Sequence, residues 1–250
     1  MSGPGPGLAI LTGPSCVGKS PLCKALGKMY PGLREGLSDV VLFNSRSPRP
    51  GERDGVDYHF RTREEIDVLR GDQRYVVMEV RGDLLAVDVH EVSEGTRQGS
   101  MLYEGNPFVA EVLVGDPRLA ELSPLSVFLS PLSREELGYL SDRRRHVDLP
   151  AMVAEIMRRK LLRRQSRARG VLAASELADI ERRATSAYGE LKLACRFSHV
   201  IPNHDGEDSD NWEAFYYPLG DARRAAEAFA ALLEGGTHPC VEQWDETVVP

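Results

Sequence analysis

Residues 13–20 read Gly13-Pro14-Ser15-Cys16-Val17-Gly18-Lys19-Ser20, and they match the phosphate-binding pattern G-x-x-x-x-G-K-[ST] at every fixed position. The apolar run over residues 8–12 predicts a buried strand, and residues 20–29 predict an amphipathic helix. A strand, a glycine-rich loop and a helix N-terminus in this order aim backbone N–H groups at an anion. We therefore expect residues 13–20 to bind the phosphates of a nucleotide.

Two side chains of this loop have predictable tasks. Lys19 supplies a positive charge for the β- and γ-phosphates, and the Ser20 hydroxyl is a ligand for Mg²⁺. The stretch thus predicts ATP as the ligand, Mg²⁺ as the cofactor and Ser20 as the metal-binding residue. Cys16 lies just before the helix N-terminus and near Lys19, which predicts a thiolate that reacts with oxidants and alkylating agents unless the residue is simply buried.

The remaining pattern alternates strands with helices. Apolar runs predict strands over 40–43, 75–80, 108–114, 126–129 and 199–202. Helices are expected over 63–69, 133–140 and 222–233, and over 150–194 with a break near Gly170. This order predicts an α/β protein with the three-layer P-loop NTPase fold, in which a central, mostly parallel sheet is covered on both faces.

Composition agrees with a globular enzyme. The chain has 250 residues, of which 42% are apolar and 28% charged, so a full core can form. Residues 1–7 lack the basic and apolar segments of a secretory signal, and we expect no membrane span. The four cysteines show no C-x-x-C spacing, which favours a reducing, cytoplasmic setting.

The net charge of −7 is unevenly distributed. Residues 143–183 hold eleven Arg and one Lys against five acids, a balance of 12 − 5 = +7, whereas residues 205–250 hold eleven acids against two Arg, a balance of −9. A basic block inside an acidic chain favours a local site for nucleotide phosphates over a nucleic-acid surface. A nucleic-acid-binding NTPase remains an alternative, and a solvated helix face is the simplest interpretation of any single arginine.

Residues 44–60 suggest a second phosphate site. Arg46 and Arg49 lie three residues apart on a loop that Pro48 and Pro50 stiffen, and together they form a fork for a second phosphate. Tyr58 adds a hydroxyl donor. An ordinary basic turn is the competing interpretation.

These segments resemble the guanylate kinases. Residues 13–20 are similar to the family's loop G-P-S-G-V-G-K-S, with Cys16 in place of a glycine. Residues 46–60 resemble its GMP-binding segment, and Met78-Glu79-Val80-Arg81-Gly82 resembles A-E-V-H-G, whose Glu binds the guanine base. Ile180 to Arg183 and Phe197 to Asn203 resemble the helix after the lid and the last strand.

The resemblance implies ATP-dependent phosphoryl transfer to a nucleoside monophosphate, GMP or dGMP, giving the diphosphate and ADP. It implies a single domain, with a core (8–41, 108–140 and 195–234), an acceptor-binding region (42–107), a helical, Arg-rich lid (141–194) and flexible tails (1–7 and 235–250). No nucleic acid or membrane partner is expected. The implied catalytic residues are Lys19, Arg46, Arg49, Arg183 and Arg169. Asn203 joins the loop in binding ATP, and the acceptor ligands are Arg46, Arg49, Tyr58, Glu79 and Glu111.

Three leucines depart from the family pattern. Leu42, Leu85 and Leu113 stand where the family has polar ligands of the acceptor, the last of them beside Glu111 in the segment that resembles the family's D-I-D strand. An apolar pocket discriminates poorly between similar bases, so we expect looser acceptor choice. The alternatives are a kinase of a different small phosphorylated acceptor and a catalytically silent guanylate-kinase-like binding module.

Overall fold

The computed structural model describes residues 6–49, 51–169 and 171–250. Its larger sheet is five-stranded and parallel, in the order β2-β7-β1-β8-β9. These strands are β1 (Leu8–Thr12), β2 (Leu37–Asp39), β7 (Ser100–Gly105), β8 (Leu125–Ser130) and β9 (His199–Pro202). All five residues of β1 are buried, as expected of a central parallel strand with helices on both faces. The expected P-loop NTPase fold is confirmed.

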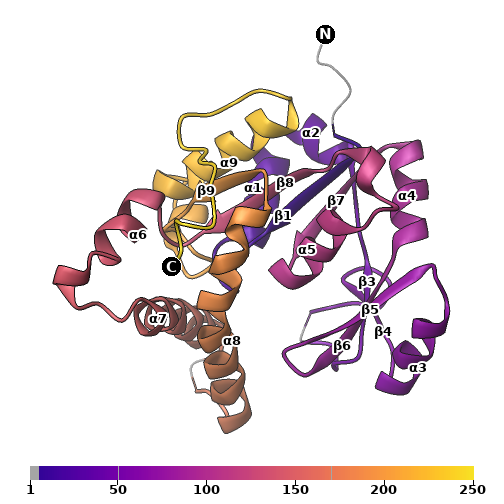
Figure 1. The fold of residues 1–250 in the computed structure, drawn as a ribbon, viewed down its shortest axis with the longest axis horizontal. Helices are drawn as coiled ribbons and strands as arrows, with labels where there is room; N and C mark the ends of the chain where they lie inside the picture. Colours follow the sequence, from indigo (N-terminus) through magenta and orange to yellow (C-terminus); the bar gives the residue numbers. More distant parts are fainter. Residues whose placement is uncertain (1–5, 50, 170) are drawn as a thin grey trace.

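A smaller sheet has the order β4-β3-β6-β5. It consists of β3 (Leu42–Asn44), β4 (Tyr58–Phe60), β5 (Tyr75–Val80) and β6 (Asp83–Asp88), with β3 parallel to β4 and antiparallel to β6. In Figure 1 this sheet lies at the lower right and the α7–α8 helix pair at the lower left, both below the larger sheet. The two small units thus flank the carboxyl end of β1, where the phosphate-binding loop begins.

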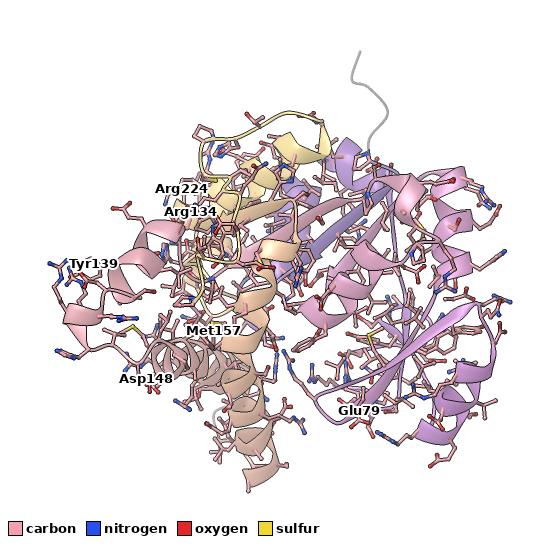
Figure 2. All side chains as sticks on the ribbon, viewed as in Figure 1. Glu79, Arg134, Tyr139, Asp148, Met157 and Arg224 are labelled. Carbon is pink, nitrogen blue, oxygen red and sulfur yellow. The ribbon has the colours of Figure 1, made fainter. Side chains whose placement is uncertain are left out.

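The helices follow from clear local signals. Helix α3 (Arg63–Val68) and helix α6 (Arg134–Leu140) each begin with a capping box, formed by Thr62 with Glu65 and by Ser133 with Glu136. The other helices are α1 (Lys19–Met29), α2 (Pro31–Glu35), α4 (Val89–Gln98), α5 (Pro107–Gly115), α7 (Leu149–Arg169), α8 (Ala174–Lys192) and α9 (Gly220–Leu233). Helices α7 and α8 pack against each other, and Val153 and Met157 of α7 are fully buried. Figure 2 labels Met157 on α7, next to α8. Helix α7 ends at Arg169 and α8 begins at Ala174, so the expected break near Gly170 is confirmed, although Gly170 itself lies outside the described residues.

Several expectations were wrong. Residues 108–114 form helix α5 rather than a strand, because Asn106 caps the segment and Pro107 occupies its first turn. The expected strand over 40–43 is replaced by β2 and β3. Residues 100–105, assigned to the acceptor-binding region, form core strand β7.

The segment after α9 is also different from the expected flexible tail. Val200 of β9 and Glu242 exchange two backbone hydrogen bonds of 2.8 Å, and Trp244 is buried against the core. The division into core, acceptor-binding region and lid otherwise stays a prediction.

Candidate active site

The phosphate-binding loop connects β1 to α1 and is fixed by close backbone contacts. A Cβ atom at Gly13 would lie 2.3 Å from the Leu129 carbonyl oxygen, and one at Gly18 would lie 2.7 Å from Asn203 Nδ2. Both glycines have positive φ, 144° and 108°, which side chains rarely tolerate. Only glycine therefore fits at these two positions of the loop.

Lys19 and Ser20 begin helix α1. Lys19 is buried, and its Nζ donates hydrogen bonds of 2.9 Å to the carbonyls of Gly13 and Pro14; burial lowers its pKa. The Ser20 hydroxyl donates to Glu104 Oε1 at 2.7 Å. Burial raises the pKa of Glu104, although Ser20 and Lys19 oppose this. A cation, a hydroxyl and a carboxylate thus meet at one end of the loop.

Asn203 supports the loop from the carboxyl end of β9. Its Nδ2 donates to the Val17 carbonyl at 2.8 Å and to the Asp205 carbonyl at 2.7 Å, and the residue is fully buried. The structure therefore places Asn203 against the loop backbone rather than in the open cleft. Its role in ATP binding stays a prediction. What the geometry shows is that Asn203 stabilises the backbone of the phosphate-binding loop.

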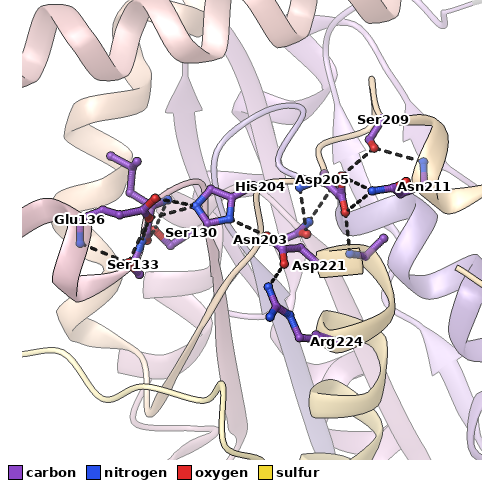
Figure 3. A network of polar contacts seen from close by, with 12 residues as sticks. Ser130, Ser133, Glu136, Asn203, His204, Asp205, Ser209, Asn211, Asp221 and Arg224 are labelled. Atoms are coloured by element: carbon purple, nitrogen blue, oxygen red, sulfur yellow. Dashed lines mark hydrogen bonds and ion pairs between the residues drawn. The ribbon is translucent and has the colours of Figure 1, made fainter. Parts of the chain in front are cut away.

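A polar network holds the segment that carries Asn203 (Figure 3). The Asp205 carboxylate accepts from Ser209 Oγ, Asn211 Nδ2 and the Ala222 N–H at 2.7–3.0 Å. His204 lies between two carboxylates, 2.5 Å from Asp221 Oδ2 and 2.9 Å from Glu136 Oε2. The network ties α6 and α9 to the back of the phosphate-binding loop.

Cys16 is buried in the loop. It is 1% exposed, and burial, with Glu207 and Asp208 nearby, raises its pKa to about 12 despite Arg164 and Arg183. The thiol is protonated at neutral pH, which favours the alternative of a simply buried cysteine over a reactive thiolate. Its φ of 69° lies in the left-handed region, at the position where the resembling loops have glycine.

The acceptor-side arginines are held by Glu52. Arg46 forms a bidentate pair with this carboxylate at 2.6 and 2.7 Å, and the Arg49 backbone N–H donates to it at 2.7 Å. The Arg46 guanidinium lies 5.0 Å from the centre of the Tyr58 ring. The structure thus brings Arg46, Arg49 and Tyr58 together, as the sequence predicted.

These groups and the phosphate-binding loop line one cleft of about 300 Å³. Arg183 of α8 also reaches it, where its Nε donates to Ser15 Oγ at 3.1 Å; burial and Arg49 lower its pKa to about 10. Arg183 therefore keeps its charge at neutral pH. Among the lining residues that were not predicted as site residues are the charged side chains Arg81, Glu104, Arg164 and Glu207.

Sequence signals for these four were weak. Glu104 follows the apolar stretch Met101–Tyr103, which could have been recognised as a strand ending in a carboxylate. Arg164 belongs to the basic block but has no local motif. Arg81 and Glu207 reach the cleft only through the tertiary fold.

Two expected acceptor ligands, Glu111 and Glu79, do not line this cleft in the ligand-free protein. Glu111 is on α5, 3.9 Å from Arg196, so the strand on which its assignment depended does not exist. Glu79 is on β5 at the lower side of the smaller sheet (Figure 2), half exposed and 2.7 Å from Arg63 Nη2. The side chain of Arg169, expected to be catalytic, lies outside the described residues.

The three leucines do not form an apolar acceptor pocket. Leu113 is fully buried in α5, and Leu42 and Leu85 are buried in the main core cluster. None of them lines the cleft among the described residues. The leucines therefore add no apolar lining to this cleft, and looser acceptor choice stays a prediction.

Many charges of the basic block over residues 143–183 are paired with acidic side chains of the same molecule. Arg164 lies 2.5 Å from Glu207, Arg167 lies 3.0 Å from Asp210, and Arg163 and Lys160 lie 3.8 and 3.9 Å from Asp208. The basic helix α7 thus faces the acidic segment 205–210, which explains the charge asymmetry of the sequence. No described helix has the length and apolar character needed to cross a membrane.

The parallel sheet, the loop at its centre and the buried Lys19 define the class of the protein, a P-loop NTPase. The family model for guanylate kinase matches residues 6–160. A guanylate kinase from Synechococcus sp. (strain JA-3-3Ab) is 31% identical over 216 residues, covering 84% of this chain and 82% of that protein. One from Corynebacterium diphtheriae is 33% identical over 221 residues, covering 83% and 93%. The chain belongs to the guanylate kinase family.

A solved structure agrees with the fold. The guanylate kinase from Anaplasma phagocytophilum superposes with a TM-score of 0.50 at 20% sequence identity, covering 91% of this chain and 84% of that one. At this identity the likeness concerns the fold alone.

Proposed function

We propose that this protein catalyses the ATP-dependent phosphorylation of GMP, and of dGMP, to the diphosphate with release of ADP. The observation that carries the proposal is the shared cleft: Lys19 of the phosphate-binding loop and the Arg46–Tyr58 pair line the same cavity. A donor site and an acceptor site that open into one cavity favour direct phosphoryl transfer. A silent binding module would not need a buried lysine at the loop.

The chemistry requires positioning and charge stabilisation rather than a covalent enzyme intermediate. An oxygen of the acceptor phosphate attacks the γ-phosphorus of ATP, and the bond from that phosphorus to the β–γ bridging oxygen breaks, leaving the electron pair on ADP. Lys19 and Arg183 stabilise the negative charge on the migrating group. Arg46, Arg49 and Tyr58 hold the acceptor phosphate in line, which requires Glu52 to share Arg46, and Asp179 to share Arg49, with the substrate.

The residues at the loop fit Mg²⁺. Ser20 Oγ and Glu104 Oε1 are hard oxygen donors 2.7 Å apart, and oxygen ligands are those that Mg²⁺ prefers. Ser20 would bind the ion directly and Glu104 directly or through water. The ion would neutralise charge on the β- and γ-phosphates.

Base selection is assigned to Glu79 by its match to the family motif. Its carboxylate would accept from guanine N1–H and the exocyclic amino group, which requires release from Arg63. Selection against adenine then follows, because adenine presents no N1–H donor to the carboxylate and would leave a polar partner unsatisfied. Four free cysteines fit a reducing setting, and we propose the cytoplasm.

The test is a screen of GMP, dGMP, AMP, CMP, UMP, dTMP and other small phosphate acceptors, with both diphosphate products quantified. We expect GMP and dGMP to be converted and the other acceptors to be poor. ATP consumption with a different acceptor would contradict the assignment of the substrate. Absence of transfer to every acceptor would contradict an enzymatic function.

A further inference from the structure

The hairpin tip between β5 and β6 has an unusual backbone. Val80 pairs with Asp83, so Arg81 and Gly82 form a two-residue turn, with φ of 55° and 91°. Positive φ at both central positions is the requirement of a type I′ turn. Glycine accepts this conformation readily, whereas arginine is disfavoured there. Such a residue persists where its surroundings hold it in place.

The surroundings of Arg81 belong to other parts of the molecule. Its Nε donates to Ser186 Oγ of α8 at 3.1 Å, and its Nη1 donates to Ser15 Oγ of the phosphate-binding loop at 3.1 Å. Its Nη2 forms an ion pair with Glu190 of α8. One side chain therefore connects the smaller sheet, the phosphate-binding loop and α8.

Glu190 is a fully buried carboxylate. Its Oε1 accepts from Arg81 and from the hydroxyl of Ser186, one helical turn earlier on α8. Its Oε2 is buried with no hydrogen-bond partner among the described residues. A buried carboxylate with so few partners depends on Arg81, the cation paired with it, because a buried charge without a counter-charge is strongly unfavourable.

We propose that Arg81 is a positioning residue that latches the acceptor side of the cleft onto the loop and α8. When the tip is docked, Ser15 accepts from Arg81 and from Arg183 together, so the same contact that closes the cleft also fixes Arg183 over the loop. Undocking would separate the acceptor fork from the loop and leave Ser15 with Arg183 as its only remaining arginine donor among these contacts. This inference rests on the proposed phosphoryl transfer for its kinetic part only, since the docking itself is a property of the ligand-free protein.

The first test compares wild type with Arg81→Ala and with Arg97→Ala, a matched control on α4 whose exposed guanidinium pairs with Glu94. We expect Arg81→Ala to lower kcat for GMP about 10- to 100-fold, as a misplaced substrate does, while the Kd of ATP changes little. Small-angle X-ray scattering of the ligand-free protein should show a larger radius of gyration for Arg81→Ala. The Arg97→Ala protein should match wild type in each measurement.

The second test separates a latch from a purely structural ion pair. Glu190→Gln removes the buried charge, so Arg81→Ala/Glu190→Gln should regain much of the thermal stability that Arg81→Ala loses. The double variant should keep the low kcat and the larger radius, because the tip remains undocked. Recovery of wild-type kcat and radius together with stability would overturn the proposal.

The outcomes also distinguish the two proposals. A wild-type protein that converts no GMP, yet expands on Arg81→Ala, contradicts the proposed function and leaves the latch intact. A wild-type protein that converts GMP, with unchanged kcat and radius in Arg81→Ala, contradicts the latch alone.

Discussion

The two walls of the cleft are built in different ways. The donor wall consists of backbone from one continuous segment, residues 13–20, packed between β1, β8 and Asn203. The acceptor wall consists of side chains on the loop 45–57 and on β4, held to one another by Glu52 and to α8 through Arg49, which lies 3.7 Å from Asp179. The donor site is therefore fixed before any ligand binds, whereas the acceptor site depends on ion pairs that the substrate must rearrange.

Because the donor wall is preformed and the acceptor wall depends on ion pairs, substitutions in the two walls should affect different kinetic constants. Damage to the donor wall should abolish transfer with every acceptor, because the triphosphate is no longer positioned or neutralised. A substitution in the acceptor wall should be selective: the KM for GMP should rise while the Kd of ATP stays nearly unchanged. The variants below test this separation.

The largest effect is expected for Lys19→Ala. Its ammonium group is the buried cation of the loop, and loss of a preorganised charge stabiliser costs about 10³-fold in turnover. Steady-state kinetics with saturating GMP would measure it, and Lys24→Ala, also on α1, is the control. Turnover near wild type in Lys19→Ala would remove the loop from the mechanism.

Arg46→Ala should separate the two walls. We expect kcat/KM for GMP to fall about 10- to 100-fold, because charge-assisted hydrogen bonds contribute about 1.5–3 kcal/mol. The Kd of ATP, measured by calorimetry, should stay within about twofold of wild type since Arg46 belongs to a separate loop. Arg70→Ala, an exposed arginine of the same unit that pairs with Asp67, is the control. Loss of ATP binding in Arg46→Ala would show that the walls are not independent.

The sequence predicts those parts of the two walls that depend on a local motif, and it does not predict contacts between distant segments. The loop was identified in full because its backbone requirements appear directly as Gly13, Gly18 and Lys19. The fork of Arg46 and Arg49 was identified by local spacing. Arg81 and Glu190 are 109 residues apart, and no local pattern reports their contact.

Helix α5 shows a different kind of failure. Its sequence, rich in valine, favours a strand by propensity, yet Val109, Ala110 and Leu113 are buried with helical spacing and Asn106 caps the helix. The cap and Pro107 were the available signals. The tertiary environment, a face packed on β1 and β7, prevailed over propensity.

Glu104→Gln tests the metal part of the donor wall. We expect the Mg²⁺ concentration for half-maximal turnover to rise about tenfold, the lower end of losses at metal-site partners. Because burial raises the pKa of Glu104, protons should compete with Mg²⁺ for this carboxylate as the pH falls. Wild type at limiting Mg²⁺ should therefore lose activity as the pH falls, and Glu104→Gln should lose this dependence. An unchanged Mg²⁺ requirement would exclude Glu104 from the metal site.

The smallest effect on turnover is expected for Asp205→Asn, which weakens the support behind the donor wall. Burial opposes ionisation of Asp205, but hydrogen bonds from Asn211, Ser209 and the Ala222 N–H lower its pKa below 3.8. A lowered folded-state pKa stabilises the protein above about pH 4 and loses that contribution as the pH falls through the folded pKa. We expect the variant to lose about 1–3 kcal/mol of unfolding free energy at pH 7, with the difference shrinking below pH 4. Chemical denaturation at several pH values measures it, and a difference that does not depend on pH would contradict the role of the carboxylate.

The pairing of Val200 with Glu242 has a further consequence, for solubility. Strand β9 is an edge strand of the larger sheet. The unpaired N–H and C=O groups of an edge strand can form hydrogen bonds with a strand of another molecule. The segment around Glu242 occupies two of these groups, and the buried Trp244 keeps it in place. Removing residues 238–250 would uncover this side of the sheet beside the apolar surface that Trp244 now covers. We expect such a shortened protein to self-associate through β9 while its phosphate-binding loop, at the middle of the sheet, remains intact.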